Sequence, residues 1–189
     1  MQGEKVNPFD ECPIYETAHF IFRLVNEEDA EDLFICYSDP ITLQHMNNDN
    51  CNGEWRPTSS EELKYAWKKD YERRTFLRWS IKDKIVGKVV GTIEIAPLPW
   101  GRWFFGQETP IGILRIDILS TYEKETVFVE IITLMSFELA NDFEVNQVIM
   151  KALPEESEKA SALLQNQFCP YTKASFPYSH YYMKTITAI

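Results

Sequence analysis

Residues 118–140 read ILSTYEKETVFVEIITLMSFELA, and this stretch predicts the end of a strand, a turn and a long helix. The turn contains no glycine and carries Glu123 and Glu125. Backbone N–H groups and the positive end of a helix dipole make such a turn a natural place for phosphate groups. The two carboxylates oppose that use, because they bring negative charge to the same place. Apolar residues recur every three or four positions in the helix, which indicates a core-facing stripe of Phe128, Ile132, Met135 and Leu139.

The segments on either side of this stretch predict a mixed sheet. A strand over Ile111–Leu119, the helix, and a buried strand over Asn146–Leu153 form one parallel crossover. Two further strands, Thr75–Ile81 and Val89–Ala96, are joined by a polar turn and indicate a hairpin-like antiparallel pair.

The remaining segments add helices and two strands. A strand over Ala18–Val25 is followed by a helix that Asn26 can cap, with Asp29 at the third helical position and Pro40 as its end. A second helix is predicted to begin near Ser59 or Ser60. A short helix over residues 155–167 and a strand over residues 178–188 close the chain. The whole pattern predicts an α+β fold, a single domain over residues 1–189 with a mixed, twisted sheet of about seven strands and helices on both faces.

Composition excludes several classes of protein. The chain has 189 residues, 44% of them hydrophobic, which fits one globular domain. Its net charge of −10 argues against a nucleic-acid partner, which would need a basic face. No apolar run reaches the roughly 18 residues of a membrane span, and the start does not resemble a secretory signal, so a soluble cytoplasmic protein with no membrane partner is expected. Neither histidines nor cysteines occur at metal-binding spacing, so no metal is expected, and free thiols are predicted for Cys12, Cys36, Cys51 and Cys169.

The order of these elements resembles the GNAT N-acetyltransferases, and several segments resemble its branch of ribosomal-protein alanine acetyltransferases. The resemblance runs from about Phe20 to Lys184. It rests on FIFRLVNEEDAEDLFICYSDP, RWSI with VVGTIEI, LRIDILSTYEKETVFVEIITLMSFE, and ALLQNQF with YYMK. The resemblance implies transfer of an acetyl group from acetyl-CoA, the co-substrate, to a primary amine of a small molecule or a protein N-terminus. The alternative is a GNAT-fold binding or regulatory module that has lost acetyl transfer.

The resemblance also implies roles for particular residues. The backbone of Ile116 and Ile118, in the strand that splays from its neighbour, is expected to hold the pantetheine arm. Asp117 is the candidate to take the proton of the attacking amine. In this fold the loop with Trp100 and Trp103 borders the acceptor groove, so these rings are expected to line a substrate pocket or a homodimer contact, with simple packing of the loop as the alternative.

The turn departs from the family's pattern, which is Q/R-x-x-G-x-G/A. Glu123, Thr126 and Phe128 fall on its three defined positions. The later family pattern N-x-x-S…G-F falls on Glu156, Lys159, Gln167 and Phe168, and only the phenylalanine is retained. The usual tyrosine general acid falls on Leu163, so the general acid is not assigned.

Two interpretations of the turn remain open. In the first, Lys124, Thr126 and backbone N–H groups replace the glycines and hold the pyrophosphate of acetyl-CoA. In the second, Ser120 and Glu123 form a capping box, Glu123 caps its own helix, and the turn holds nothing.

Overall fold

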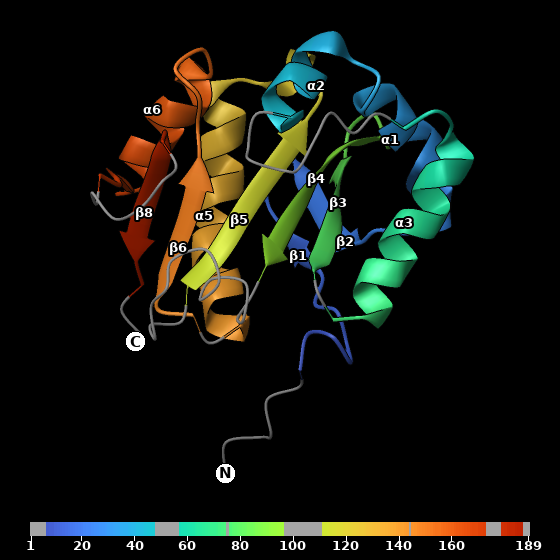
Figure 1. Ribbon diagram of the computed structural model, residues 1–189, viewed down its shortest axis with the longest axis horizontal. Coiled ribbons are helices and arrows are strands. Elements are labelled where there is room, and N and C mark those ends of the chain that lie inside the picture. Colours follow the sequence, from blue (N-terminus) through green and yellow to red (C-terminus); the bar gives the residue numbers. More distant parts are fainter. Residues whose placement is uncertain are drawn as a thin grey trace.

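The computed structural model describes residues 7–47, 57–74, 76–96, 111–143, 145–172 and 179–186 of the chain. Its strands form one eight-stranded sheet in the order β1-β2-β3-β4-β5-β6-β8-β7 (Figure 1). The strands are β1 Tyr15–Glu16, β2 Phe20–Leu24, β3 Leu77–Asp83, β4 Val89–Ala96, β5 Ile111–Ile118, β6 Gln147–Lys151, β7 Cys169–Pro170 and β8 Tyr181–Thr185. The helices are η1 Glu27–Asp29, α1 Ala30–Cys36, α2 Pro40–Asn47, α3 Ser60–Glu72, η2 Ser120–Tyr122, α5 Glu125–Asp142 and α6 Ser157–Gln165.

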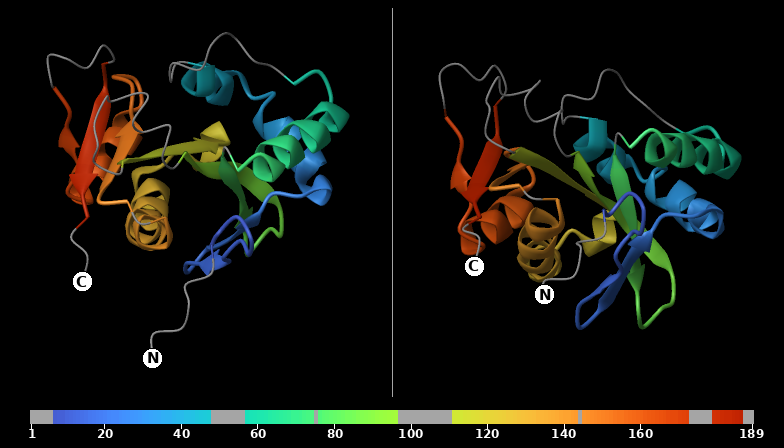
Figure 2. Two further views of the ribbon diagram at one scale, coloured as in Figure 1. Left: turned by 60° about the horizontal axis from the view of Figure 1, so that its bottom comes forward. Right: turned by 90° about the horizontal axis from the view of Figure 1, so that it is seen from below.

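The sheet is mixed, as the sequence predicts. All pairs of neighbouring strands are antiparallel except β5 and β6, which are parallel and joined through α5. Helices lie on both faces of the sheet, with α5 and α6 on one face and α1, α2 and α3 on the other (Figure 2). The sheet has eight strands, against about seven predicted: the six segments named from the sequence and the two-residue strands β1 and β7, which form its two edges.

The main core lies between the sheet and α5. Phe128, Ile132 and Met135 of the predicted stripe are buried there against β3, β4 and β5. The side chain of Phe128 is 2% exposed, so this bulky residue faces the core and leaves the first turn of α5 open at its backbone. None of the described helices is both long and apolar enough to cross a membrane.

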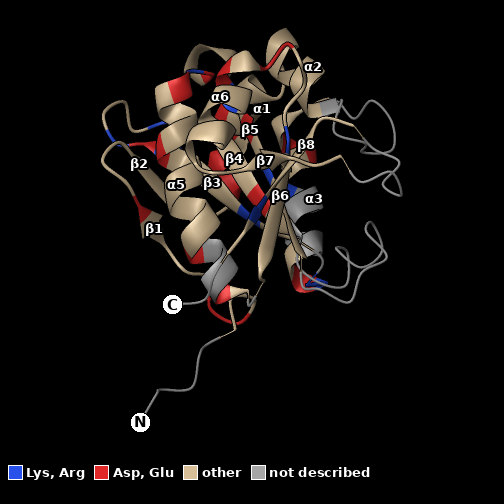
Figure 3. Cartoon of the chain, turned by 90° about the vertical axis from the view of Figure 1, so that its left-hand side faces the viewer, with Lys and Arg blue, Asp and Glu red and all other residues tan. Residues whose placement is uncertain are grey.

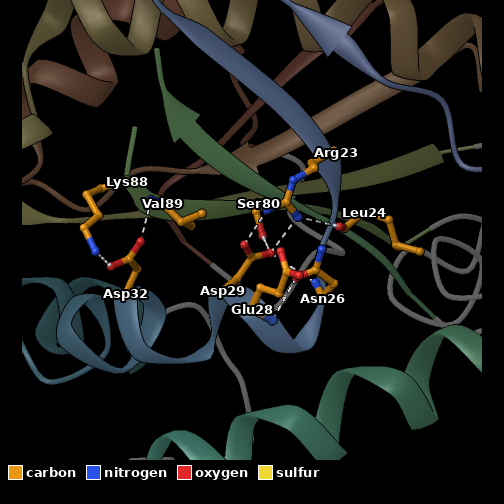
Figure 4. A network of polar contacts seen from close by, with 9 residues as sticks. All are labelled: Arg23, Leu24, Asn26, Glu28, Asp29, Asp32, Ser80, Lys88 and Val89. Carbon is orange, nitrogen blue, oxygen red and sulfur yellow. Dashed lines mark hydrogen bonds and ion pairs between the residues drawn. The ribbon is translucent and has the colours of Figure 1, made fainter. Parts of the chain in front are cut away.

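The start of α1 is fixed to the sheet by a buried carboxylate, Asp29 (Figure 4). Asn26 and Asp29 form the capping box that the sequence predicts. Asp29 also accepts hydrogen bonds from both terminal nitrogens of Arg23, at 2.9 and 2.6 Å, and from Ser80 Oγ at 2.6 Å. One turn later Asp32 accepts from the backbone N–H of Val89 at 3.0 Å. These contacts set the position of α1 over β3 and β4.

One helix, α2, is absent from the sequence-based prediction, which has Pro40 end a helix and a loop follow it. Pro40 is instead the first residue of α2. Asp39 precedes it, and Asp39 Oδ1 accepts from the backbone N–H groups of Ile41 at 3.1 Å and Thr42 at 2.8 Å. Proline fits the first position of a helix because its missing N–H would have no helical partner there. The prediction was therefore wrong at Pro40, which starts a helix instead of ending one.

Candidate functional site

The site is built around the divergence of two parallel strands, β5 and β6. Their pairing begins at Ile111↔Gln147 and ends at Ile113↔Ile149, although β5 continues to Ile118. On its other edge, β5 stays paired with β4 up to Ile118↔Gly91. Figure 1 shows β5 and β6 moving apart towards α2 and α6. The second half of β5 therefore has only one strand neighbour among the described residues.

The alternation of the antiparallel ladder fixes which groups of β5 face β6. Leu119 N–H donates to Val90 O of β4 at 2.9 Å, so the backbone N–H and C=O groups of Leu119 face β4. Because the direction alternates along a strand, the N–H and C=O groups of Ile116 and Ile118 point away from β4, towards the diverging side. The C=O of Ile118 accepts a hydrogen bond from Thr42 Oγ1 of α2 at 3.0 Å. The backbone groups of these two residues therefore point to the diverging side, and their contact with a pantetheine arm stays a prediction.

The turn after β5 does not form the predicted capping box. Ser120 Oγ donates to Asp39 Oδ2 at 3.0 Å, and Glu123 Oε1 lies 2.8 Å from His45 Nδ1 of α2. Glu123 precedes α5, which begins at Glu125. The capping-box interpretation is wrong because both side chains have partners 81 and 78 positions earlier in the chain, Asp39 just before α2 and His45 within it.

A carboxylate from another helix takes the place of the predicted cap. The backbone N–H of Glu125, the first residue of α5, donates to Glu158 Oε2 of α6 at 2.8 Å. Gln165, also of α6, donates to the carboxylate of Glu125. The first bond of the helix ladder runs from Phe128 N–H to Lys124 O at 3.0 Å. The N–H groups of Thr126 and Val127 belong to the first turn, where a helix has no acceptor of its own.

A buried ion pair lies beside this turn. Lys159 and Glu156 are each 7% exposed, and they form an ion pair one turn apart at the start of α6. Glu156 Oε2 also accepts from Leu153 N–H at 2.8 Å, and Lys159 Nζ lies 5.6 Å from the centre of the Phe128 ring. These are the positions of the family's asparagine and serine, so here ions replace neutral polar groups. Leu163, at the tyrosine position, is fully buried and has no proton to give.

His45 makes the charge of the turn depend on pH. Its hydrogen bond to Glu123 raises the pKa of His45, while burial opposes the rise. The charges of Glu123 and Glu156 add to the rise, and the charge of Lys159 opposes it. A raised pKa in the folded protein means that the charged pair stabilises the fold fully below the ordinary histidine pKa, and that this stabilisation is lost as pH rises through the folded pKa.

We therefore expect His45→Gln to lower the free energy of unfolding more at pH 6 than at pH 9. Glutamine can still donate one neutral hydrogen bond to Glu123, so the difference reports the charge alone. The measurement is urea unfolding of the wild type, both single variants His45→Gln and Glu123→Gln, and the double variant. Their coupling energy should shrink as pH rises; a coupling energy that is constant from pH 6 to pH 9 would contradict the ionic pair.

Asp117 lies on the opposite face of β5 from the core, beneath α1 and α2. Its side chain is 10% exposed and lies 3.1 Å from Arg115 Nε. Thr92 is its direct partner on β4, and Thr92 Oγ1 lies 2.7 Å from the hydroxyl of Tyr37. Burial, and after it the charge of Asp117, raises the pKa of Tyr37, so this hydroxyl keeps its proton. A carboxylate, a hydroxyl and a guanidinium thus meet at one place on the sheet.

The other sequence-predicted residues divide into two groups. Lys124 and Thr126 are exposed at the start of α5, close in sequence to the backbone groups described above. Trp100, Trp103 and Cys51 lie outside the described residues. Within the described ranges, no three histidine, cysteine or acidic side chains are grouped as metal ligands would be. No local pattern points to His45 or Glu158, since each acts through a contact with a residue distant along the chain.

Solved structures share this arrangement of elements. A ribosomal-protein alanine acetyltransferase from Vibrio fischeri is 14% identical, with 92% of this chain and 96% of that one covered and a TM-score of 0.62. RimL, a ribosomal-protein α-N-acetyltransferase in complex with coenzyme A, is 11% identical over 92% of this chain and 98% of its own, with a TM-score of 0.69. A GNAT-family acetyltransferase from Bacillus anthracis is 10% identical over 92% and 98%, with a TM-score of 0.67. The chain has the GNAT fold.

Sequence similarity is weaker than this likeness of fold. An uncharacterized N-acetyltransferase of Bacillus subtilis, YoaA, is 27% identical over 81 residues, which are 43% of this chain and 44% of that protein. The match therefore spans less than half of that relative. No family model matches the chain. The structure establishes the GNAT fold.

Proposed function

We propose that the protein transfers an acetyl group from acetyl-CoA to a primary amine. The observation that carries this proposal is the backbone of Ile116 and Ile118, which points towards the side where β5 and β6 diverge. A pantetheine arm is a short chain of amides, and it can pair with such a strand edge through N–H and C=O groups. The coenzyme A complex of RimL, which has the same fold, supports this use of the site.

In this proposal each end of the acetyl-CoA molecule has its own residues. The pyrophosphate lies at the start of α5, where Lys124 and the N–H groups of Thr126 and Val127 donate to it. The thioester lies along β5, with a backbone N–H polarising its carbonyl. That Trp100 and Trp103 border the acceptor groove stays a prediction, because both lie outside the described residues. The single domain over residues 1–189, a cytoplasmic location and a homodimer stay predictions.

Asp117 is the proposed proton acceptor. The neutral amine attacks the thioester carbonyl carbon and forms a C–N bond, and the negative charge develops on the carbonyl oxygen. The amine's proton passes to Asp117, directly or through a water molecule. The C–S bond then breaks, and coenzyme A leaves as a thiolate that takes up a proton. The net charge of −10 favours approach of a cationic amine.

Calorimetric titration with acetyl-CoA tests the proposal directly. Binding at micromolar concentration, followed by acetylation of an amine detected by mass spectrometry, is the expected result. No heat and no thermal shift at millimolar acetyl-CoA would overturn it and leave a binding or regulatory module with the GNAT fold.

The carboxylate of Glu158 should weaken the binding of acetyl-CoA. It occupies the N–H of Glu125 at the start of α5, close to where the pyrophosphate is placed. Glu158→Gln keeps an acceptor for that N–H but removes the negative charge, so we expect acetyl-CoA to bind about tenfold more tightly at low salt. The gain should shrink at 1 M salt, where the Debye length is about 3 Å.

A matched control is Glu72→Gln, an exposed glutamate at the end of α3 that should leave the affinity unchanged. If Glu158→Gln binds acetyl-CoA as the wild type does, the pyrophosphate does not lie at the start of α5.

A further inference from the structure

A row of charged side chains crosses the sheet beside Asp117. The register pairs Arg78 of β3 with Glu94 of β4, and Glu94 with Arg115 of β5. These three residues, called here the Arg–Glu–Arg row, lie on the face that carries α1, α2 and α3. Figure 3 shows acidic and basic segments side by side on the central strands. The next row towards α2 holds Ser80, Thr92 and Asp117.

The contacts within the row tie both guanidiniums to carboxylates. Arg78 Nε donates to Glu94 Oε2 at 2.9 Å. Arg115 Nε lies 3.1 Å from Asp117, and Arg115 Nη2 donates to Met46 O at 3.4 Å. Two positive and two negative side chains therefore share one patch. All four keep some exposure to solvent: Arg78 is 19% exposed, Glu94 11%, Arg115 21% and Asp117 10%.

This charge pattern is more than a proton acceptor requires. A carboxylate alone would attract a simple amine. The two guanidiniums lie on β3 and β5, the strands on either side of β4 and each about 4.8 Å from it, and their charge repels an ammonium group. Ion pairs at this depth also contribute little net stability, so packing alone does not account for them. An acceptor that carries its own negative charge removes the repulsion. Its amine can approach Asp117 while its anionic group meets Arg115.

We propose that the acceptor is a small zwitterion, an amine with a carboxylate or phosphate group a few bonds away. The inference rests on the proposed function, which places the acceptor amine beside Asp117. Arg115 and Asp117 are two positions apart on one strand, about 6.6 Å along it, which limits the amine and the anion to the scale of one amino acid. A guanidinium has five N–H donors in a planar fork, so Arg115 can hold Asp117 and a ligand anion together. Arg78 adds a second positive charge on the same side.

Equilibrium binding of matched amines tests the inference without turnover. Calorimetry, with and without coenzyme A, compares alanine with alaninamide, and O-phosphoethanolamine with ethanolamine. We expect at least one of the two amines that carry an anionic group to bind about tenfold or more tightly than its partner without that group. The alanine pair reports a carboxylate and the ethanolamine pair reports a phosphate. Binding measured without coenzyme A stays informative even if acetyl-CoA does not bind, so failure of the proposed function and failure of this inference are distinguishable.

Variants of Arg115 assign the effect to the row. Arg115→Met keeps the aliphatic length and should lower the affinity for the preferred zwitterionic amine about tenfold, with little change for its partner that lacks the anionic group. Arg115→Lys keeps the charge and should retain the preference for the anion. Arg74→Met, at an exposed arginine paired with Asp10, is the control and should change neither affinity. Three results would overturn the inference: equal affinity for both members of each pair, no binding of alanine or O-phosphoethanolamine at millimolar concentration, or an equal loss in Arg115→Met for the amines with and without the anionic group.

Discussion

Asp117→Asn should lower kcat for acetyl transfer by about 100- to 10,000-fold, the usual contribution of a positioned general base. Asparagine has nearly the same shape and can still accept a hydrogen bond from Arg115 Nε, which lies 3.1 Å from the carboxylate. It cannot take a proton from the amine. The loss should persist at high pH, where more of the acceptor amine is neutral, because the step that is lost is the removal of its proton during the attack.

Steady-state kinetics over a range of pH give the measurement, with acetyl-CoA affinity determined separately. Affinity for acetyl-CoA should stay near the wild-type value, because Asp117 faces away from the core side of β5. Asp10→Asn, at an exposed acid, is the matched control and should leave kcat unchanged. An undiminished kcat in Asp117→Asn at every pH would remove this residue from the mechanism.

Local sequence patterns predicted most of the fold. The strands β2 to β5, the capping box of Asn26 and Asp29, and the stripe of α5 each depend on residues close in sequence. The strands, the capping box and three residues of the stripe, Phe128, Ile132 and Met135, are confirmed, while the side chain of Leu139 lies outside the described part of the chain. The parallel crossover from β5 to β6 also follows from local order, because a strand, a helix and a strand in succession favour it. Strands β1 and β7 were not predicted, since two residues carry no periodic pattern.

The site was less accessible to sequence reasoning than the fold. Backbone groups of Ile116 and Ile118 could be predicted because a resemblance in element order places them on the diverging strand. One of the two open interpretations made Glu123 the cap of its own helix, because a capping box is a local pattern. Its partner is His45 of α2, and the acceptor at the start of α5 is Glu158 of α6. Both partners come from helices whose positions depend on the packing of the whole sheet.

The Arg–Glu–Arg row shows the same limit. The sequence places Arg78, Glu94 and Arg115 in three strands that were all predicted. Which of them face each other depends on strand register, and a shift by one residue would move each to the opposite face of the sheet. Arg115 and Asp117 share a face by alternation alone, so that pair was within reach of the sequence.

Asp29→Asn should lower the free energy of unfolding by about 3–5 kcal/mol, the usual cost of removing one partner of a buried ion pair. The side chain of Asp29 is 2% exposed, and it accepts hydrogen bonds from Arg23, Asn26 and Ser80 (Figure 4). An asparagine turns an NH₂ group towards one of these donors and leaves the guanidinium of Arg23 without its carboxylate. This loss is a large part of the roughly 5–15 kcal/mol that stabilises a typical domain.

Urea unfolding at neutral pH measures this loss, and Glu28→Gln is the control. Glu28 is exposed one position earlier, so its replacement should change the free energy of unfolding by no more than about 0.5 kcal/mol. A loss below about 1 kcal/mol in Asp29→Asn would mean that Arg23, which is 24% exposed, turns to water when its partner is removed.

Asp29 also fixes α1 over β3, and α1 ends beside Tyr37, whose hydroxyl lies 2.7 Å from Thr92 Oγ1. The variant should therefore also weaken acceptor binding beside Asp117, while Glu28→Gln should not.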